Sequence, residues 1–156
     1  MHWGQDGEQP NAELFVREVT AFLRAQRDGR PAVLWPQYDH PAVESPEFDG
    51  QLTSLAADLA ACLGRPVQAH PAGPPGPPSD GPRTTVAEGL LMQGLGASGV
   101  TVTSPAGPGG TTPRRQRIRL RAGEMLYVPC GTTYTVDRQA DSQYGVLTVA
   151  PDGPAD

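Results

Sequence analysis

The stretch LRAGEMLYVPCGTTYTV, residues 120–136, contains the pattern that decides the fold. A Gly-Glu pair at 123–124 predicts a tight turn, and the apolar run that follows predicts a strand. The Pro-Cys-Gly corner at 129–131 predicts a second reversal, followed by an alternating strand that carries Tyr134. Strands joined by such short turns are typical of a small antiparallel barrel or sandwich. We expect Glu124 to accept hydrogen bonds from backbone N–H groups in the first turn.

The chain on both sides of this stretch continues the β pattern. Short apolar or alternating runs, separated by turn residues, lie at 83–96, 98–104, 115–123 and 144–150. Further upstream, a strand that ends at His70 is expected, and a shorter apolar run at 30–36 predicts another. Together these runs predict a mainly β fold built around a small barrel.

Two helices are expected before the barrel. Residues 11–29 carry an apolar stripe at helical spacing, with Asn11 as a candidate N-cap and Gly29 as a candidate end. Residues 51–64 form a second amphipathic helix closed by a glycine. The segment 40–50 is interpreted as a loop in which His40 is a surface residue. The stretch 71–82, rich in Pro and Gly, is predicted to be a surface loop, because these residues disfavour helix and central sheet.

The composition restricts the compartment and the partners. The chain has 156 residues and a formal charge of −5, and its twelve basic side chains are all arginine. This mildly acidic balance argues against nucleic-acid binding, and the absence of lysine excludes Schiff-base chemistry. Cys62 and Cys130 form neither a disulfide framework nor a metal-binding pattern, and no apolar run is long enough to cross a membrane. We therefore expect a reduced, cytoplasmic protein that does not enter membranes.

Two segments resemble the cupin-fold Jumonji-C and ribosomal-oxygenase-type hydroxylases. In that family Gly-Pro precedes His-x-Asp and an apolar strand that ends in Gln. Here Gly81-Pro82 precedes Arg83-Thr84-Thr85, and GLLMQGLG places Gln93 at the family's Gln. Residues 120–134 are similar to the family's Leu-x-Pro-Gly-Asp-x-Leu-Tyr-x-Pro-x-Gly-x-x-His.

The resemblance covers about residues 50–150 and implies a small cupin-like double-stranded β-helix, or jelly-roll, barrel with two N-terminal helices. Residues 1–50 would then supply a helix and a first strand packed on the barrel. Residues 51–150 would form the barrel, and 151–156 a tail, within a single domain.

The same resemblance places the family's metal-binding triad at Arg83, Thr85 and Tyr134. Fe(II) in that family needs two histidines and one carboxylate on one face of the metal. Arginine has no lone pair for a metal, and threonine is a poor neutral ligand. No two of the three histidines, at positions 2, 40 and 70, have metal-site spacing. The resemblance therefore implies a degenerate member that binds no metal and no cofactor.

A barrel without its metal retains groups that could hold a ligand. Arg83 would anchor a carboxylate or phosphate through its planar fork of donors, or it could point outward or fill the former metal space. Tyr134 could serve as packing or as a proton donor. The other candidate ligand contacts are Thr85, Gln93, His70, Glu88 and Tyr144.

A row of arginines marks the strand at 115–121. Arg117, Arg119 and Arg121 alternate with Ile118 and Leu120, so their guanidinium groups are predicted to share one outer face. Such a row usually forms a solvated edge that discourages aggregation. The alternative is that it binds an acidic protein or peptide.

Three functions follow from these features. The first is a metal-free, pseudo-oxygenase-like protein that binds a partner protein, a peptide or a small anion. It would be an accessory subunit in bacterial specialised metabolism, a context suggested by the actinomycete-like composition. The second is a metal-independent cyclase, isomerase, epimerase or dehydratase in which Arg83 holds an anion and Tyr134 transfers a proton. The third is an Fe(II)/2-oxoglutarate hydroxylase with unusual ligands. A homodimer formed through sheet edges is compatible with each.

Overall fold

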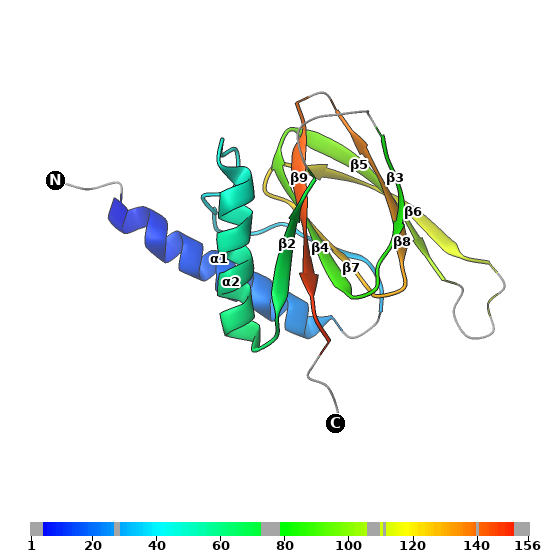
Figure 1. Ribbon diagram of the computed structural model, residues 1–156, viewed down its shortest axis with the longest axis horizontal. Coiled ribbons are helices and arrows are strands. Elements are labelled where there is room, and N and C mark those ends of the chain that lie inside the picture. The colour runs from blue at the N-terminus through cyan, green and yellow to red at the C-terminus, as the bar shows by residue number, and fades with distance from the viewer. Residues whose placement is uncertain are drawn as a thin grey trace.

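The structure, a computed structural model, describes residues 5–26, 29–72, 79–105, 110, 112–139 and 141–151 (Figure 1). It contains two helices, α1 (Gln5–Ala25) and α2 (Phe48–Leu63). The strands are β1 (Ala32–Leu34), β2 (Val67–Pro71), β3 (Ser79–Thr84), β4 (Glu88–Leu95), β5 (Ala97–Ser104), β6 (Arg114–Arg121), β7 (Met125–Val128), β8 (Thr133–Arg138) and β9 (Gln143–Val149).

The strands form two antiparallel sheets that face each other. One sheet has the order β1-β7-β4-β9-β2, and the other has the order β3-β8-β5-β6. Successive strands such as β8 and β9 lie in different sheets, which is the crossover pattern of a jelly roll. The fold is therefore a mainly β, cupin-like small barrel with two N-terminal helices, as predicted.

The barrel interior is filled by inward-facing residues from both sheets. Alternate positions of β8 and β9 point inward, so Tyr134 and Val136 meet Tyr144 and Val146 in one apolar cluster with Leu91. Each such aliphatic side chain contributes about 1.5–3 kcal/mol when it is fully buried. This cluster closes one part of the barrel and leaves the part near β2 and β3 for a cavity.

Both helices cover the outer face of the five-stranded sheet (Figure 1). Phe48 and Leu52 of α2 are fully buried against this face. They approach the sheet at Gly94 and Gly145, where an added Cβ would collide with the Phe48 ring and with Leu52 respectively. Glycine at these two strand positions therefore sets how closely α2 can pack.

The described helices differ from the prediction at their N-termini. The first helix begins at Gln5 and ends at Ala25, so the proposed N-cap Asn11 lies inside it and Gly29 lies beyond it. The second begins at Phe48 instead of residue 51, and Gly64 ends it with φ 71°, as expected. Within the described residues, no helix combines the length and the apolar character needed to cross a bilayer.

The Pro/Gly-rich stretch is not a loop throughout. Its last residues belong to β3, and residues 73–78 lie outside the described part of the chain. β3 is the edge strand of its sheet and its pairing with β8 shifts register between Asp80 and Arg83. A proline within the strand is tolerated there because an edge strand does not need every N–H for pairing.

Candidate ligand cavity

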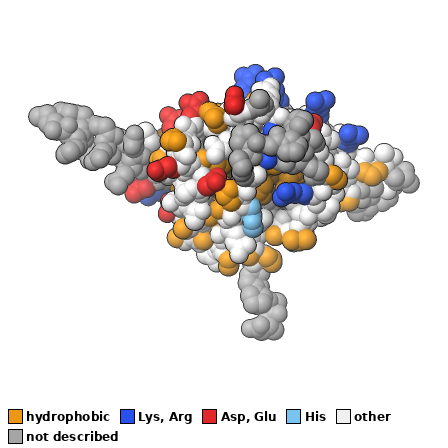
Figure 2. Space-filling model, turned by 45° about the horizontal axis from the view of Figure 1, so that its top comes forward, with side chains coloured by type: hydrophobic (Ala, Val, Ile, Leu, Met, Phe, Trp, Pro, Cys, Tyr) orange, Lys and Arg blue, Asp and Glu red, His pale blue; other side chains and the backbone are white. Residues whose placement is uncertain are grey.

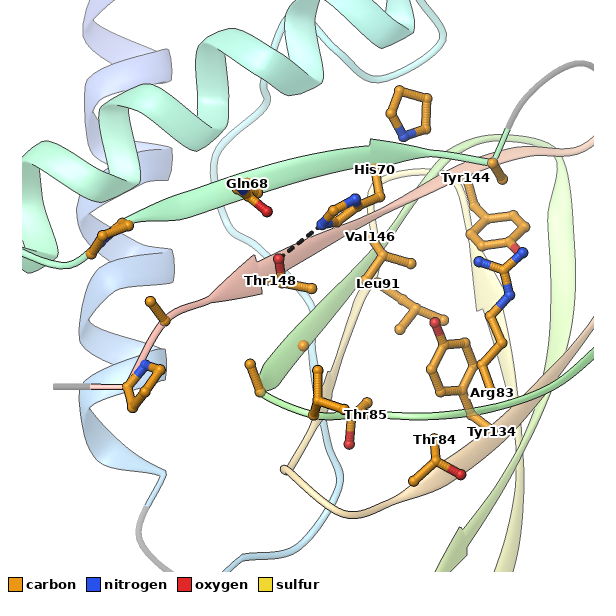
Figure 3. Close-up of a pocket in the computed structure, with 18 residues that line it drawn as sticks. Gln68, His70, Arg83, Thr84, Thr85, Leu91, Tyr134, Tyr144, Val146 and Thr148 are labelled. Carbon is orange, nitrogen blue, oxygen red and sulfur yellow. Dashed lines mark hydrogen bonds between the residues drawn. The ribbon is translucent and has the colours of Figure 1, made fainter. Parts of the chain in front are cut away.

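A cavity of about 620 Å³ lies inside the barrel, between the edges of the two sheets (Figure 3). Its walls come from β2, β4 and β9 of one sheet and from β3 and β8 of the other. The β3–β4 turn and the segment after β9 complete its lining. A volume of this size is in the range of small-molecule sites.

Arg83, Tyr134 and Tyr144 gather at one end of this cavity (Figure 3). Arg83 and Tyr134 are register partners on β3 and β8, so their side chains leave the sheet on the same face. Tyr134 and Tyr144 are 7% and 5% exposed, whereas Arg83 is exposed. Among the described residues no carboxylate pairs with Arg83. A guanidinium at this position can bind a planar anion with two parallel hydrogen bonds.

Thr85 also lines the cavity, but its hydroxyl is engaged in the chain itself. Its Oγ1 donates to the carbonyl of Pro129 at 2.6 Å and accepts from the N–H of Thr132 at 3.0 Å. Its backbone N–H and carbonyl bond to Thr132 and Gly131 at 2.9 Å each. Thr85 therefore ties the β3–β4 turn to the Pro129 corner. Arg83, Thr85 and Tyr134 line the same cavity, and Thr85 makes structural hydrogen bonds there.

His70 lies on the β2 wall of the cavity (Figure 3). Its Nε2 lies 2.9 Å from Oγ1 of Thr148 on β9, which also lines the cavity. The prediction that His70 faces the barrel mouth agrees with this position. Nε2 of the imidazole is hydrogen-bonded to Thr148, and the ring is a polar group halfway along the β2 wall.

Arg138 was not predicted to belong to the site. It does not line the cavity, but it contacts Tyr144, which does. It is 9% exposed, its guanidinium lies 5.2 Å from the centre of the Tyr144 ring, and its Nη2 donates to the carbonyl of Ala72 at 3.2 Å. This cation–π contact fixes the Tyr144 ring at the end of the cavity. The sequence carried a signal for it, because Arg138 follows Tyr134 and Val136 at the inward-facing spacing of two.

The structure does not bring Gln93 to the cavity. Gln93 points inward, but it lies near the opposite end of β4. Its Nε2 donates at 2.8 Å to the carbonyl of Leu95 and to Oγ of Ser142, which is 2.7 Å from Oγ of Ser98. All three polar side chains are buried. Gln93 therefore joins the two sheets at the far end of the barrel.

Glu88 faces away from the barrel interior. It forms an ion pair with Arg65 at 2.8 Å, and Oε1 accepts a hydrogen bond from the Tyr127 hydroxyl at 2.8 Å. The buried phenol next to this carboxylate has its pKa raised, chiefly by burial and then by the hydrogen bond to Glu88. Glu88 thus accepts the hydrogen bond of the Tyr127 hydroxyl, whose ring packs beneath the helices, and it does not line the cavity.

The side chains at the cavity do not fit a cupin-type Fe(II) site. The positions to which the family resemblance assigns the triad hold a guanidinium, a hydroxyl that is already hydrogen-bonded and a phenol, and His70 is the one imidazole on the described walls. Among the described residues, no group of three or more His, Cys, Asp or Glu could hold a metal ion. A facial triad requires two imidazoles and a carboxylate. No chemical step through iron is therefore assigned to this chain.

The arginine row is placed as predicted on a sheet edge. Among the described strands, β6 pairs with β5 alone, in unbroken register from Arg114 to Arg121. Arg117, Arg119 and Arg121 are exposed, while Leu120 between them is buried. On the face drawn in Figure 2, acidic side chains gather toward the helical side and basic ones over the sheets. Acidic and basic side chains are thus separated on this face.

The fold is a cupin-like barrel. Among the described residues that line its cavity, Arg83 carries the permanent positive charge. No protein family matches the sequence, and no curated protein matches it. Among solved structures, the cupin domain of Drosophila melanogaster CENP-C is similar, with 15% identity and a TM-score of 0.41 over 54% of this chain and 59% of that chain. The chain therefore spans about three fifths of the length of that domain.

Two enzymes show comparable similarity. RmlC from Streptococcus suis, solved with dTDP-D-xylose, has 13% identity and a TM-score of 0.46 over 60% of this chain and 48% of that chain. Hydroquinone 1,2-dioxygenase from Sphingomonas sp. TTNP3 has 16% identity and a TM-score of 0.40 over 53% of this chain and 57% of that chain. The similarity to these proteins concerns the fold alone.

Proposed function

We propose that this chain is a metal-free, cupin-like protein that binds a small carboxylate ligand in its barrel cavity. The observation that carries the proposal is the position of Arg83, the one residue with a permanent charge on the described walls of the cavity. Two buried tyrosines lie at the same end. A hydrogen bond from the guanidinium to a carboxylate is charge-assisted and is therefore stronger than one between neutral groups.

A matched pair of probes tests the proposal. Benzoate and the neutral isostere benzamide are titrated separately into the protein, and binding is measured by calorimetry. Because hydrogen bonds to charged groups contribute about 1.5–3 kcal/mol, benzoate should bind at least about tenfold more tightly than benzamide. Arg83→Gln should remove this preference, whereas Arg17→Gln, at an exposed position on α1, should preserve it.

Chelation provides the second arm of this experiment. If the cation is supplied by Arg83, treatment with EDTA leaves the affinity for benzoate unchanged. Loss of benzoate binding after chelation, with recovery on adding Fe(II), would overturn the metal-free proposal. Equal affinities of the Arg83→Gln variant and the unmodified protein would overturn the role of the arginine.

A second candidate function is metal-independent proton transfer on the bound acid. It is favoured by the presence of both Tyr134 and His70 on the walls of the cavity that holds Arg83. Such catalysis needs positioning and a proton carrier, and no redox cofactor. The protein in D₂O should then incorporate deuterium next to the carboxyl group of 2-oxo acids, detected by NMR. Tyr134→Phe should abolish incorporation with binding retained; absence of incorporation by the unmodified protein would eliminate this candidate.

Binding of an acidic partner at β6 is a separate proposal. Its support is the exposed row of Arg117, Arg119 and Arg121 on a sheet edge that pairs on one side only. An extended segment with alternating acidic residues could add to this edge through backbone hydrogen bonds and pair with the row. A Glu-rich peptide should bind in low salt, and reversal of Arg117 and Arg119 to Glu should abolish binding. Unaltered binding of the peptide by the reversed variant would reject the proposal.

A further inference from the structure

The lining of the cavity changes in character along its length. On β9 the residues Tyr144, Val146 and Thr148 follow one another on the inner face, and Ala150 comes next. β2 runs antiparallel beside them, with His70 opposite Val146. At about 3.4 Å per residue, the path from Tyr144 to Ala150 is about 20 Å long. The cavity is thus an elongated channel whose two ends can be compared.

One end of the channel is polar and cationic. It is formed by Arg83 with Tyr134 and Tyr144, and the Tyr144 ring is held by Arg138. The middle combines Leu91 and Val146 with the His70–Thr148 pair (Figure 3). A ligand that enters this end must present an anion or another hydrogen-bond acceptor.

The opposite end is apolar. Gln68 of β2 lies opposite Thr148 on the cavity wall, and the lining residues beyond this pair along the strands are apolar: Pro66, Val86, Ala87, Ala150 and Pro151. Val86, at the β3–β4 turn, is 92% exposed. A single exposed valine is unremarkable, but here it adjoins four further apolar residues at the rim of a cavity. Such a rim gains stability when an apolar group covers it.

Gly89 lies on the channel wall between the two ends. It is register partner of Thr148 and lies on the cavity wall, where it adds no side chain to the inner face. A Cβ built on it would meet its closest neighbours, Thr85 Cγ2 and the Val128 carbonyl oxygen, at 3.8 Å, an ordinary contact distance. A larger side chain at this position can therefore be accommodated by the backbone and would project into the channel.

We propose that the ligand is an amphipathic monocarboxylic acid, with its carboxylate on Arg83 and an unbranched apolar tail that passes Gly89 to the Val86 rim. This inference rests on the proposed function, since it takes the anion at Arg83 as given. Beyond the carboxylate, we infer that the rest of the ligand is long and apolar. Both properties follow from the separation between the cationic end and the apolar rim.

A chain-length series tests the inference. Hexanoate, octanoate, decanoate and the corresponding alcohols, all below their micelle-forming concentrations, are titrated into the protein by calorimetry. Because burying one methylene contributes about 0.8 kcal/mol, the affinity of the acids should rise about fourfold per added methylene. Each acid should bind at least about tenfold more tightly than its alcohol. Arg83→Gln should remove the difference between acid and alcohol and keep the dependence on chain length.

The variant Gly89→Val separates the two proposals. It should leave the affinity for hexanoate within a few-fold and abolish the gain for decanoate, and Gly89→Ala, a smaller obstruction, should give an intermediate result. If the acids bind through Arg83 but chain length has no effect, the amphipathic inference is overturned and the anion site stands. If Arg83→Gln binds every acid as tightly as the unmodified protein does, the proposed function itself fails. Thermal unfolding of each variant verifies that it is folded.

Discussion

Arg83 and Tyr134 lie directly opposite each other on β3 and β8, and both side chains line the barrel cavity. In a relative with a metal triad, the equivalent positions would hold two ligands of one iron. Here the same convergence gathers a permanent cation and a phenol. This pair is the basis of the proposed anion site.

The Arg138–Tyr144 contact should stabilise this end of the barrel. Arg138→Met keeps much of the side-chain volume and removes both the cation–π contact and the hydrogen bond to the Ala72 carbonyl. We expect the free energy of unfolding to fall by about 1–3 kcal/mol, measured by urea denaturation. Arg114→Met, at an exposed site on β6, is the control and should change stability little. A loss no larger than that of the control would show that the contact does not stabilise the fold.

Gly145 should tolerate no side chain. Its Cβ position is occupied by Leu52 of α2, and Phe48 lies 3.4 Å away. Gly145→Ala should lower the free energy of unfolding by about 1–3 kcal/mol, because overpacking forces the helix away from the sheet. The control is Gly99→Ala on β5, where the nearest neighbour of a new Cβ, Asp137 Cβ, would lie 3.9 Å away. The double variant Gly145→Ala/Leu52→Ala should recover part of the loss if the collision is its cause.

The sequence pattern predicted strand positions well, because alternation and turn residues act locally. The turn at 121–124 is an example: Oε1 of Glu124 accepts the N–H of Arg121 at 2.9 Å, as expected from the Gly-Glu pair. The barrel strands likewise follow the apolar runs. The N-cap preference of asparagine predicts a helix start at Asn11, yet α1 begins at Gln5 and includes Gly7 and Pro10, which have poor helix propensity.

The cavity could be predicted only in part. Arg83, Tyr134 and Thr85 were placed together by the family resemblance, and their convergence agrees with the structure. Gln93 and Arg138 were not separable by sequence, since both are polar residues on inward-facing strand positions. Neither side chain lines the cavity: Gln93 bonds to Ser142 near the opposite end of β4, and Arg138 contacts the Tyr144 ring. These positions depend on the pairing of strands distant in sequence, and a local pattern does not contain that information.

His40 should make stability depend on pH. It was predicted to be a surface residue, but it is 6% exposed. Its ring centre lies 5.0 Å from that of Phe15 with the two ring planes tilted by 44°, and its Nδ1 accepts the N–H of Ala42 at 3.0 Å. Burial lowers its pKa below the usual 6.5, and the nearby Asp58 opposes this only in part. The unfolded chain therefore binds a proton more readily than the folded one, so stability is full above pH 6.5 and falls as the pH decreases below it.

His40→Asn tests this dependence, because the Asn side-chain oxygen can also accept the Ala42 N–H. Urea denaturation between pH 7.5 and pH 5 should show a smaller loss of stability on acidification for this variant than for the unmodified protein. His70→Gln is the control for the exposed histidine and should keep the full slope. Equal slopes for His40→Asn and the unmodified protein would contradict the assignment to His40.

The arginine row on β6 should keep this edge from pairing with a second copy. β6 offers eight residues of regular strand, with no proline and no register shift against β5. Among its described neighbours it is covered on one side only, which is the geometry of an aggregation-prone edge. In an antiparallel pair of two β6 edges, Arg117, Arg119 and Arg121 would face the same row of the other copy, and like charges directly opposite are unfavourable.

Replacing these three arginines with threonine, a strong strand former without charge, should therefore promote association. We expect sedimentation velocity at micromolar concentration to show dimers or larger species for the triple variant under conditions where the unmodified protein sediments as a smaller species. Raising the salt concentration should shift the unmodified protein in the same direction, since screening weakens the repulsion. If the unmodified protein is already dimeric and the triple variant dissociates, the arginines instead stabilise an interface, and the row would have the opposite role.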